Sequence, residues 1–358
     1  MLTVIITSYG NRPYLARSID YWSRSPYNVI IADGSTRPWV GELHSNINYL
    51  HLPTPPDTDP IADYAYRKLV AIESVTTPYI AQCADDDFLA FNGLRRCVAF
   101  LEARQDVVAT QGWGPGFSHD EFNLRWLFPD FSTKPIEQAI SELPDLRMKQ
   151  ILNPFAGIMY AVFRTPVLRD AIKLTQGLTS ELMIELSVSI SSVIIGKFIS
   201  LPFFYQAREI LPSAGNKHGI RVDRWMKEPD NIGPSEKWKD ELAVYLGQNS
   251  KNTNLDDARN QVQSALTFYT SRLNLIGRRN FINNIPGHLK HAIRLVVPRP
   301  LLRIRRLGEF PQNSYSEYPL SIDSLPHKDD PISLNDAKAD FAEILTSIHK
   351  FGPMSVNR

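Results

Sequence analysis

Three consecutive aspartates, Asp85, Asp86 and Asp87, most constrain what this chain can fold into. They follow an apolar run at 78–84 that predicts a buried strand, and they precede a stretch with helical spacing at 93–104. Adjacent carboxylates at a strand end repel one another and lose hydration, so a fold keeps them only where a cation or polar groups neutralise them. Carboxylate oxygens suit Mg²⁺ or Mn²⁺. The alternative is a solvated turn whose aspartate caps the next helix.

Apolar runs and helical segments alternate along the first half of the chain. We expect strands at 3–7, 28–32, 47–52, 79–83 and 107–111, and helices at 14–24, 61–75 and 93–104. This order, with an optional helix between the second and third strands, predicts a mainly parallel sheet with helices on both faces. Further on, we expect a flexible or tightly turned loop at 112–116, a helix at 179–194, and apolar runs at 154–163 and 198–205. In parallel sheets ligands bind beyond the carboxyl ends of the strands, where the three aspartates fall.

Composition narrows the class of protein. A chain of 358 residues with 43% hydrophobic content can form one large or two modest domains. Its net charge of +1 creates no field that would recruit nucleic acid. Cys83 and Cys97 lack metal-binding spacing and indicate reduced thiols in a cytosolic protein. No basic leader precedes the first strand, so we expect no signal peptide. The longest apolar stretch, 182–204, includes charged residues and serines, which favours a buried helix and strand over a membrane span.

The character of the chain changes near residue 222, so we expect one domain at 1–222 and a mostly helical extension at 223–358. The extension includes a stretch, 258–308, with no Asp or Glu and ten Lys or Arg residues. This stretch is either a basic surface that rests on anionic lipid, a packed helical subdomain with a solvated basic face, or a site for an anionic polysaccharide. In the lipid interpretation the inward-facing residues are Leu289, Ile293, Leu295, Leu301 and Leu302.

Four motifs, in order, resemble those of GT-A fold nucleotide-sugar glycosyltransferases, closest to glycosyltransferase family 2, over roughly residues 1–220. They lie at 4–15 (the first strand and turn), 29–36 (the family's VDDGS strand end), 66–68 (a basic residue before the metal strand) and 79–89 (the DxD strand). One position departs from the family, because Ala84 stands where the family usually has an aspartate. The resemblance implies an α/β GT-A fold.

The resemblance also implies roles for residues at the strand ends. Thr7, Ser8 and Tyr9 would bind the nucleotide sugar, with Tyr9 against the uracil, and Asp33 would accept a hydrogen bond from the base. Arg67 would contact the nucleotide and Asp85 the ribose or the metal. Asp86 and Asp87 would hold Mn²⁺ or Mg²⁺ against the diphosphate, and the cation would stabilise the departing nucleoside diphosphate. The alternatives are an ordinary turn tyrosine, an Asx-turn at Asp33 and a solvated arginine.

Two later segments complete the implied site. The general base that an inverting transferase needs would be Glu181, with Glu185 second, four residues apart on one helix face. The alternative for Glu181 is a helix-capping role, with the cap near Leu178 or Thr179. Farther along, His218 would be a third metal ligand and Lys217 would bind phosphate, together with Arg208. A solvent-exposed loop histidine is the alternative there.

The resemblance implies an inverting, metal-dependent transfer of a sugar from a nucleotide-diphosphate donor, with UDP favoured, to a glycan or lipid-linked acceptor of a cell-surface polysaccharide. Such a protein would be cytoplasmic or peripheral on the inner face of the membrane, through 258–308, with no nucleic-acid partner. A nucleotidyltransferase is one alternative, although the loop at 8–13 is poor in the glycines that hold a triphosphate. A non-catalytic scaffold or glycan-binding protein on a decayed transferase fold is another, and Ala84 supports it.

Overall fold

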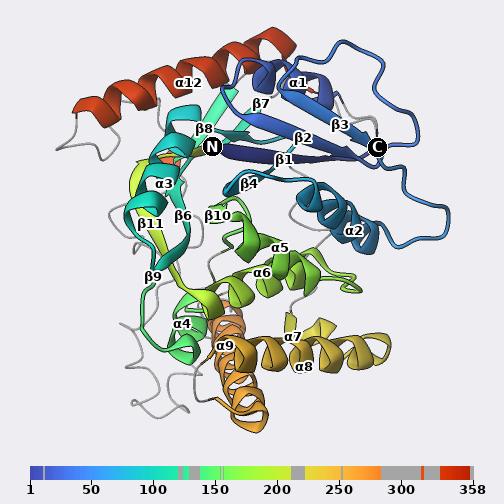
Figure 1. The fold of residues 1–358 in the computed structure, drawn as a ribbon, viewed down its shortest axis with the longest axis vertical. Coiled ribbons are helices and arrows are strands. Elements are labelled where there is room, and N and C mark those ends of the chain that lie inside the picture. The colour runs from blue at the N-terminus through green and yellow to red at the C-terminus, as the bar shows by residue number, and fades with distance from the viewer. Residues whose placement is uncertain are drawn as a thin grey trace.

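A mixed eight-stranded sheet lies at the centre of the part of the chain that the structure describes (Figure 1). The computed structural model describes residues 1–10, 13–119, 124–128, 138–153, 155, 157–210, 222–250, 253–283, 316–317 and 331–354. The strand order is β3-β2-β1-β4-β10-β6-β11-β9. Its strands are β1 (Leu2–Ser8), β2 (Asn28–Asp33), β3 (Ile47–His51), β4 (Tyr79–Ala84), β6 (Val107–Trp113), β9 (Gln138–Ala139), β10 (Val162–Arg164) and β11 (Lys197–Phe204).

The strands that carry the predicted site are parallel and end level with one another. β1 pairs in parallel with β2 and β4, and β2 pairs in parallel with β3. The register places Ser8 beside Asp33 and Thr7 beside Ala84. β9 and β10 are antiparallel to their neighbours. The predicted α/β fold with a mainly parallel sheet is therefore confirmed.

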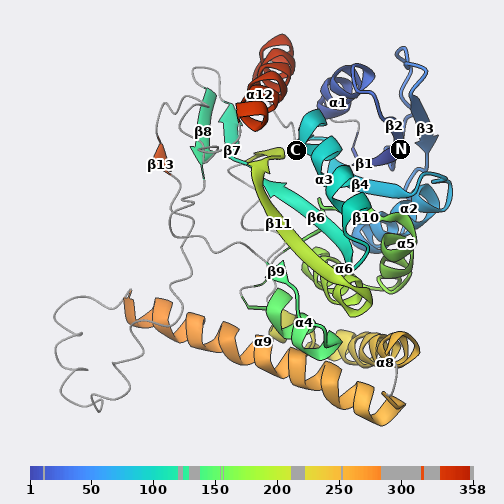
Figure 2. The ribbon, with the colours of Figure 1, turned by 60° about the vertical axis from the view of Figure 1, so that its left-hand side comes forward.

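Helices cover both faces of this sheet (Figures 1 and 2). They are α1 (Tyr14–Ser23), α2 (Pro60–Glu73), α3 (Phe91–Ala103), α4 (Pro144–Ile151), α5 (Thr165–Lys173), α6 (Glu181–Ile195), α7 (Val222–Trp225), α8 (Ile232–Asn249), α9 (Leu255–Asn283) and α12 (Pro331–Phe351), with a short 3₁₀ helix at Pro229–Asn231. Side chains alternate between the faces of a strand, so β1 contributes to two apolar cores. Ile5 packs in the core on the side of α2, α5 and α6, whereas Val4 and Ile6 pack in the core beneath α1, α3 and α12.

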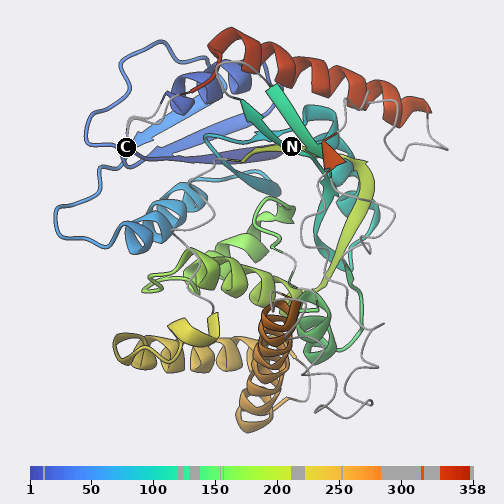
Figure 3. The same cartoon turned by 180° about the vertical axis from the view of Figure 1, so that it is seen from behind.

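The long apolar stretch forms the buried helix α6 followed by the strand β11, as the sequence predicted. The serines in α6 are buried, and one of them accepts a hydrogen bond from α8, which packs against α6. Trp238 of α8 donates a hydrogen bond of 2.9 Å from its ring nitrogen to Ser187 Oγ. Figure 3 shows α8 and α9 lying beyond α6, on the side away from the sheet. No helix in the described ranges has the length and apolar character needed to cross a bilayer.

Two details of local structure differ from what the sequence suggested. The segment between β2 and β3 contains turns and bends but no helix, although the sequence allowed one there. The glycine-rich segment 112–116, predicted as a flexible or tightly turned loop, is a shorter connection, because its ends belong to β6 and to the next strand, β7 (Gly116–His119), and only Gly114 and Pro115 lie between them. Close packing explains the glycines, since a Cβ at Gly114 would lie 1.7 Å from the carbonyl oxygen of Gln206. Apart from its first part in α9, the basic stretch 258–308 lies outside the described residues, and the domain boundary near 222 stays a prediction.

A second sheet stands beside the first, in the order β13-β8-β7-β12-β5. Its other strands are β5 (Phe88–Leu89), β8 (Leu124–Phe128), β12 (Gln206–Glu209) and β13 (Ser316–Glu317). β5 directly follows the three aspartates, and it pairs with β12 through the partners Leu89–Gln206 and Phe88–Ala207. The acidic turn is therefore tied at one end to the main sheet and at the other end to the smaller one.

The C-terminal helix α12 caps α3 from another part of the chain. Ala90 precedes α3 and has no side chain that could accept a hydrogen bond there. Instead, Asp340 of α12 accepts hydrogen bonds from the backbone nitrogens of Asn92 (3.0 Å) and Gly93 (3.3 Å). Asp340 is 3% exposed, and burial raises its pKa to about 6. The helix that follows the acidic turn is thus completed by a residue some 250 positions away.

We expect Asp340→Ala to lower the free energy of unfolding by about 1–2 kcal/mol, because the first backbone N–H groups of α3 lose their acceptor. Urea denaturation followed by circular dichroism measures this loss. Asp336→Ala on the same helix is the matched control, since it removes only the partly exposed contacts to Arg95 and Arg96 and should cost at most about 0.5 kcal/mol. Equal losses in the two variants would contradict the capping role.

Candidate functional site

The ends of β1 and β4 are joined by a hydrogen bond between side chains. Ser8 Oγ donates to Asp85 Oδ2 at 2.6 Å, and both residues are buried. A carboxylate at this depth needs such a donor, because burial without one disfavours its charged form. The first aspartate of the triplet is therefore turned inward, toward the end of β1.

Asp87 is also buried, and three groups from other segments contact its carboxylate. The Tyr160 hydroxyl donates to it at 2.7 Å, the backbone nitrogen of Glu209 donates at 2.8 Å, and Arg208 Nε lies at 3.5 Å. Burial, followed by the negative charge of Asp86, raises the pKa of Asp87 to about 6. Two neighbouring carboxylates in this position are the arrangement that a bound cation would stabilise.

Asp86 is the aspartate whose carboxylate remains available. Its backbone carbonyl accepts a hydrogen bond of 2.8 Å from Arg17 Nη2, and Arg17 forms a buried ion pair of 2.6 Å with Glu209. Tyr14 donates to the same glutamate at 3.2 Å. Arg17 of α1, paired with Glu209 of β12, thus holds the backbone of the turn in place. Among the described residues, the side chain of Asp86 has no hydrogen bond or ion pair, and it is partly exposed.

Asp33, at the end of β2, is fully buried and bonded within the protein. Its Oδ1 accepts hydrogen bonds from the backbone nitrogen (2.9 Å) and the hydroxyl (2.6 Å) of Ser35, which is the Asx-turn named above as the alternative. Its Oδ2 accepts a hydrogen bond of 2.6 Å from the Tyr49 hydroxyl. A contact from Asp33 to a base stays a prediction. Tyr9, 46% exposed, is the more accessible of the two residues predicted to meet the base.

Arg67 of α2 is buried beneath this edge of the sheet. Its Nη1 donates to the backbone carbonyl of Ser8 at 2.7 Å, and its Nε pairs with Asp63 at 2.8 Å. Its guanidinium also lies 5.6 Å from the centre of the Tyr9 ring. Gly34 makes this arrangement possible, because a Cβ there would lie 2.2 Å from Arg67 Nη1. The structure therefore links Arg67 to Tyr9 and Ser8, and a contact with a nucleotide stays a prediction.

The two candidate bases lie at the start of α6 but differ in their surroundings. Glu181 is the first residue of the helix and is exposed. The capping residue is Ser180, whose hydroxyl accepts from the backbone nitrogen of Met183 at 3.4 Å, and not Leu178 or Thr179. Glu185 is half-buried, and burial raises the pKa of its carboxyl group. The local sequence did not identify the capping residue, because Ser180 and Thr179 are both good capping residues.

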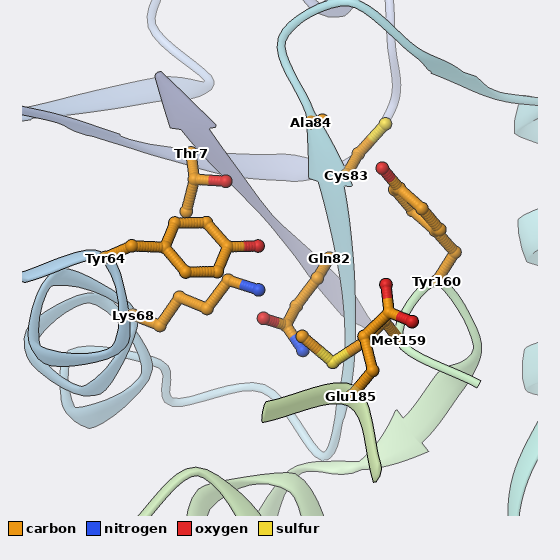
Figure 4. Close-up of a pocket in the computed structure, with 9 residues that line it drawn as sticks. All are labelled: Thr7, Tyr64, Lys68, Gln82, Cys83, Ala84, Met159, Tyr160 and Glu185. Carbon is orange, nitrogen blue, oxygen red and sulfur yellow. The ribbon is translucent and has the colours of Figure 1, made fainter. Parts of the chain in front are cut away.

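Glu185 lines a pocket beneath the ends of β1 and β4, which Figure 4 shows in close-up. Thr7 belongs to this pocket, as do two residues to which the sequence analysis assigned no role, Lys68 and Gln82. Gln82 could have been noticed as a polar residue inside an otherwise apolar strand. Tyr160 carried no comparable signal, because it contacts Asp87 across 73 positions of sequence.

The residues predicted to bind a metal are only partly described. Lys217 and His218 lie outside the described residues. Within the described ranges, no three His, Cys, Asp or Glu side chains gather closely enough to hold a metal ion. Asp86 and Asp87 nevertheless fit Mg²⁺ or Mn²⁺, because such ions are commonly held by one or two carboxylates together with phosphates and water. Cys83 and Cys97, which the sequence predicted to be reduced thiols, are free cysteines, and both are buried.

No family model matches this chain, and no curated protein matches it significantly. Among solved structures, it resembles an S. aureus TarS fragment in complex with UDP-GlcNAc, with a TM-score of 0.49, 13% identity, and coverage of 81% of this chain and 77% of that one. Another TarS fragment structure gives 0.48 and 14%, covering 98% and 90% of the two chains. A complex with UDP gives 0.41 and 12%, covering 76% and 91%.

We expect Gly34→Ala to destabilise the protein by about 1–3 kcal/mol. The added methyl group displaces the buried guanidinium of Arg67, which is bonded to both Ser8 and Asp63. Denaturant unfolding measures the effect. Gly233→Ala in α8 is the matched control, since a Cβ there meets nothing within 4 Å, and it should leave the stability unchanged or slightly higher. A Gly34→Ala protein as stable as the wild type would show that Arg67 moves without cost.

Proposed function

We propose that this protein is a metal-dependent glycosyltransferase that uses a nucleotide-diphosphate sugar, with UDP favoured. The proposal rests on one observation, namely which carboxylates of the acidic turn are bonded within the protein and which one is available. Asp85 and Asp87 are fixed by groups from β1, β12 and Tyr160, whereas the carboxylate of Asp86 is left available at the carboxyl edge of parallel strands. Ligands bind at this edge in such sheets. A rigid turn that presents one carboxylate there, beside a second one, supports a cation-assisted phosphate site.

In this proposal Asp86 and Asp87 hold Mn²⁺ or Mg²⁺, with His218 as a third ligand and Lys217 near the phosphates. The cation would supply Lewis-acid stabilisation of the negative charge on the departing nucleoside diphosphate. Tyr9 would border the base, and Thr7, Ser8, Asp33, Arg67 and Asp85 would complete the nucleotide-sugar site. The buried ion pair between Arg17 and Glu209 supports this role indirectly, because it holds the backbone of Asp86 in place.

The reaction that fits is an inverting transfer. A hydroxyl group of the acceptor attacks the anomeric carbon while the bond from that carbon to the diphosphate oxygen breaks, and the hydroxyl proton passes to a general base. Glu181 is our first candidate for the base, because it is exposed at the start of α6 and an acceptor can reach it. Glu185 is the second candidate. The proton thus ends on a carboxylate, and the electron pair of the broken bond leaves with the nucleoside diphosphate.

We place the acceptor among glycans or lipid-linked glycans of a cell-surface polysaccharide. The acid-free sequence 258–308 supports contact with the inner face of a membrane, since basic segments are attracted to anionic lipid. The protein would then act in the cytoplasm or on that face of the membrane.

We expect the wild type to bind one UDP-, GDP- or dTDP-sugar more tightly with Mn²⁺ than with a chelator, and Asp86→Asn to lose at least about 10-fold of that metal-dependent affinity. Isothermal titration calorimetry measures both. Asp86 is the preferred position because its side chain has no partner in the described structure whose loss would disturb folding. Asp240→Asn, on the exposed side of α8, is the control. Absence of nucleotide-sugar binding, or binding that needs neither metal nor Asp86, would instead support the non-catalytic scaffold.

We expect Glu181→Gln to lower the rate of sugar transfer by roughly 100- to 10,000-fold while donor affinity stays within about 2-fold of the wild type, because the amide cannot accept the proton. Release of nucleoside diphosphate in the presence of acceptor measures the rate. If Glu185→Gln shows this behaviour and Glu181→Gln does not, the base is the second glutamate. If neither does, the proposed step is wrong.

A further inference from the structure

The pocket beneath the ends of β1 and β4 contains polar groups that lack hydrogen-bond or ion-pair partners in the described part of the chain (Figure 4). Gln82 is 4% exposed, and its Nε2 has no hydrogen-bond partner among the residues that the structure describes. Lys68 is 3% exposed, and its Nζ lies 4.0 Å from the centre of the Tyr64 ring. No carboxylate lies at ion-pairing distance from it among the described residues. The carboxylate of Glu185 likewise has no hydrogen bond or ion pair within the described part of the chain.

Native proteins rarely leave a buried donor without a partner. Here Gln82 Nε2 is such a donor, and Lys68 and the half-buried Glu185 beside it also lack partners among the described residues. The pKa shifts of Lys68 and Glu185 agree with this lack of partners. Burial lowers the pKa of Lys68 to about 7, and it raises the pKa of Glu185. Both shifts disfavour the charged forms, whereas a close ion pair between the two groups would favour them. The pocket therefore suits a polar occupant.

The arrangement of these groups restricts the chemistry of the occupant. Lys68 and Gln82 offer hydrogen-bond donors, and Glu185 offers an acceptor. A hydroxyl group both donates and accepts, so it can satisfy the two sides at once. A phosphate would be repelled by Glu185, and an apolar group would leave all three unsatisfied. The cavity of about 40 Å³ has room for one or two hydroxyl groups.

The position of the pocket indicates which molecule carries the hydroxyl groups. Cys83 and Ala84 line the pocket and directly precede the acidic turn. Tyr160, which donates to Asp87, lines it as well. A group attached to a diphosphate at the acidic turn would thus lie close to the pocket.

We infer that this pocket binds one or two hydroxyl groups of the transferred sugar, with Gln82 and Lys68 donating to them and Glu185 accepting from them. The inference rests on the proposed function and adds to it the residues that select the sugar. A site built around a substrate hydroxyl rejects the analogue that lacks it far more strongly than a site that only encloses it. Gln82 and Lys68 would therefore be specificity-determining residues.

The test compares the preferred nucleotide sugar with its monodeoxy analogues and with the free nucleoside diphosphate, by calorimetry in the presence of Mn²⁺. For the wild type, we expect removal of one particular hydroxyl group to weaken binding by at least about 10-fold. In Gln82→Met and in Lys68→Met, the parent sugar should bind at least about 10-fold more weakly than to the wild type, and the difference between parent and deoxy analogue should fall below about 3-fold. Free nucleoside diphosphate should bind all three proteins alike.

Gln111→Met is the matched control, because Gln111 is a similarly buried glutamine in β6 that does not line the pocket. Gln82→Met removes a buried donor that has no partner, so its melting temperature should equal or exceed that of the wild type. The Lys68 variant provides a second, independent measurement. Wild-type protein that binds every deoxy analogue as well as the parent would show that the pocket holds only water, and the inference would fall while the proposed function stands. Wild-type protein that binds no nucleotide sugar would overturn both.

Discussion

The hydrogen bond from Ser8 to Asp85 joins the ends of two neighbouring parallel strands, and the rest of the candidate site is arranged around it. Three consecutive carboxylates cannot be buried together without donors to compensate them. The fold meets this requirement unequally. Asp85 and Asp87 receive donors from β1, from Tyr160 and from the backbone of Glu209, and the carboxylate of Asp86 is left partly exposed. The unequal compensation turns an acidic cluster into a rigid support for one available carboxylate.

The second sheet contributes to this support as much as the first. β4 enters the acidic turn from the main sheet, and β5 leaves it to pair with β12. Because β12 carries both Arg208 and Glu209, the strand that pairs beyond the turn also supplies contacts within it. The ion pair of Glu209 with Arg17 then connects the turn to α1. The neighbouring pocket is different in character, since its polar groups are brought together without being satisfied by one another.

Much of the framework could be predicted from the sequence, because the relevant signals are local. Apolar runs that end in polar residues placed the strands β1, β2 and β4 and the acidic turn. Local signals also failed in definite places. Segment 112–116 was interpreted as a flexible or tightly turned loop because glycines usually mark turns, whereas β6 and β7 take up all but Gly114 and Pro115, and Gly114 is required by the close approach of the Gln206 backbone. Asp33 was given two interpretations, and the structure shows the Asx-turn.

The sequence by itself determined the alternation of strands and helices, the mainly parallel sheet, and the position of the acidic residues at the carboxyl ends of its strands. Hydrophobic periodicity and turn residues determine these features because they act over a few positions. Only the tertiary structure decided which aspartate is available, that Asp340 caps α3, and that Lys68, Gln82 and Glu185 surround one pocket. These contacts join residues that lie tens to hundreds of positions apart. Burial and hydrogen bonding between such residues depend on how whole elements pack, and no local pattern in the chain records that packing.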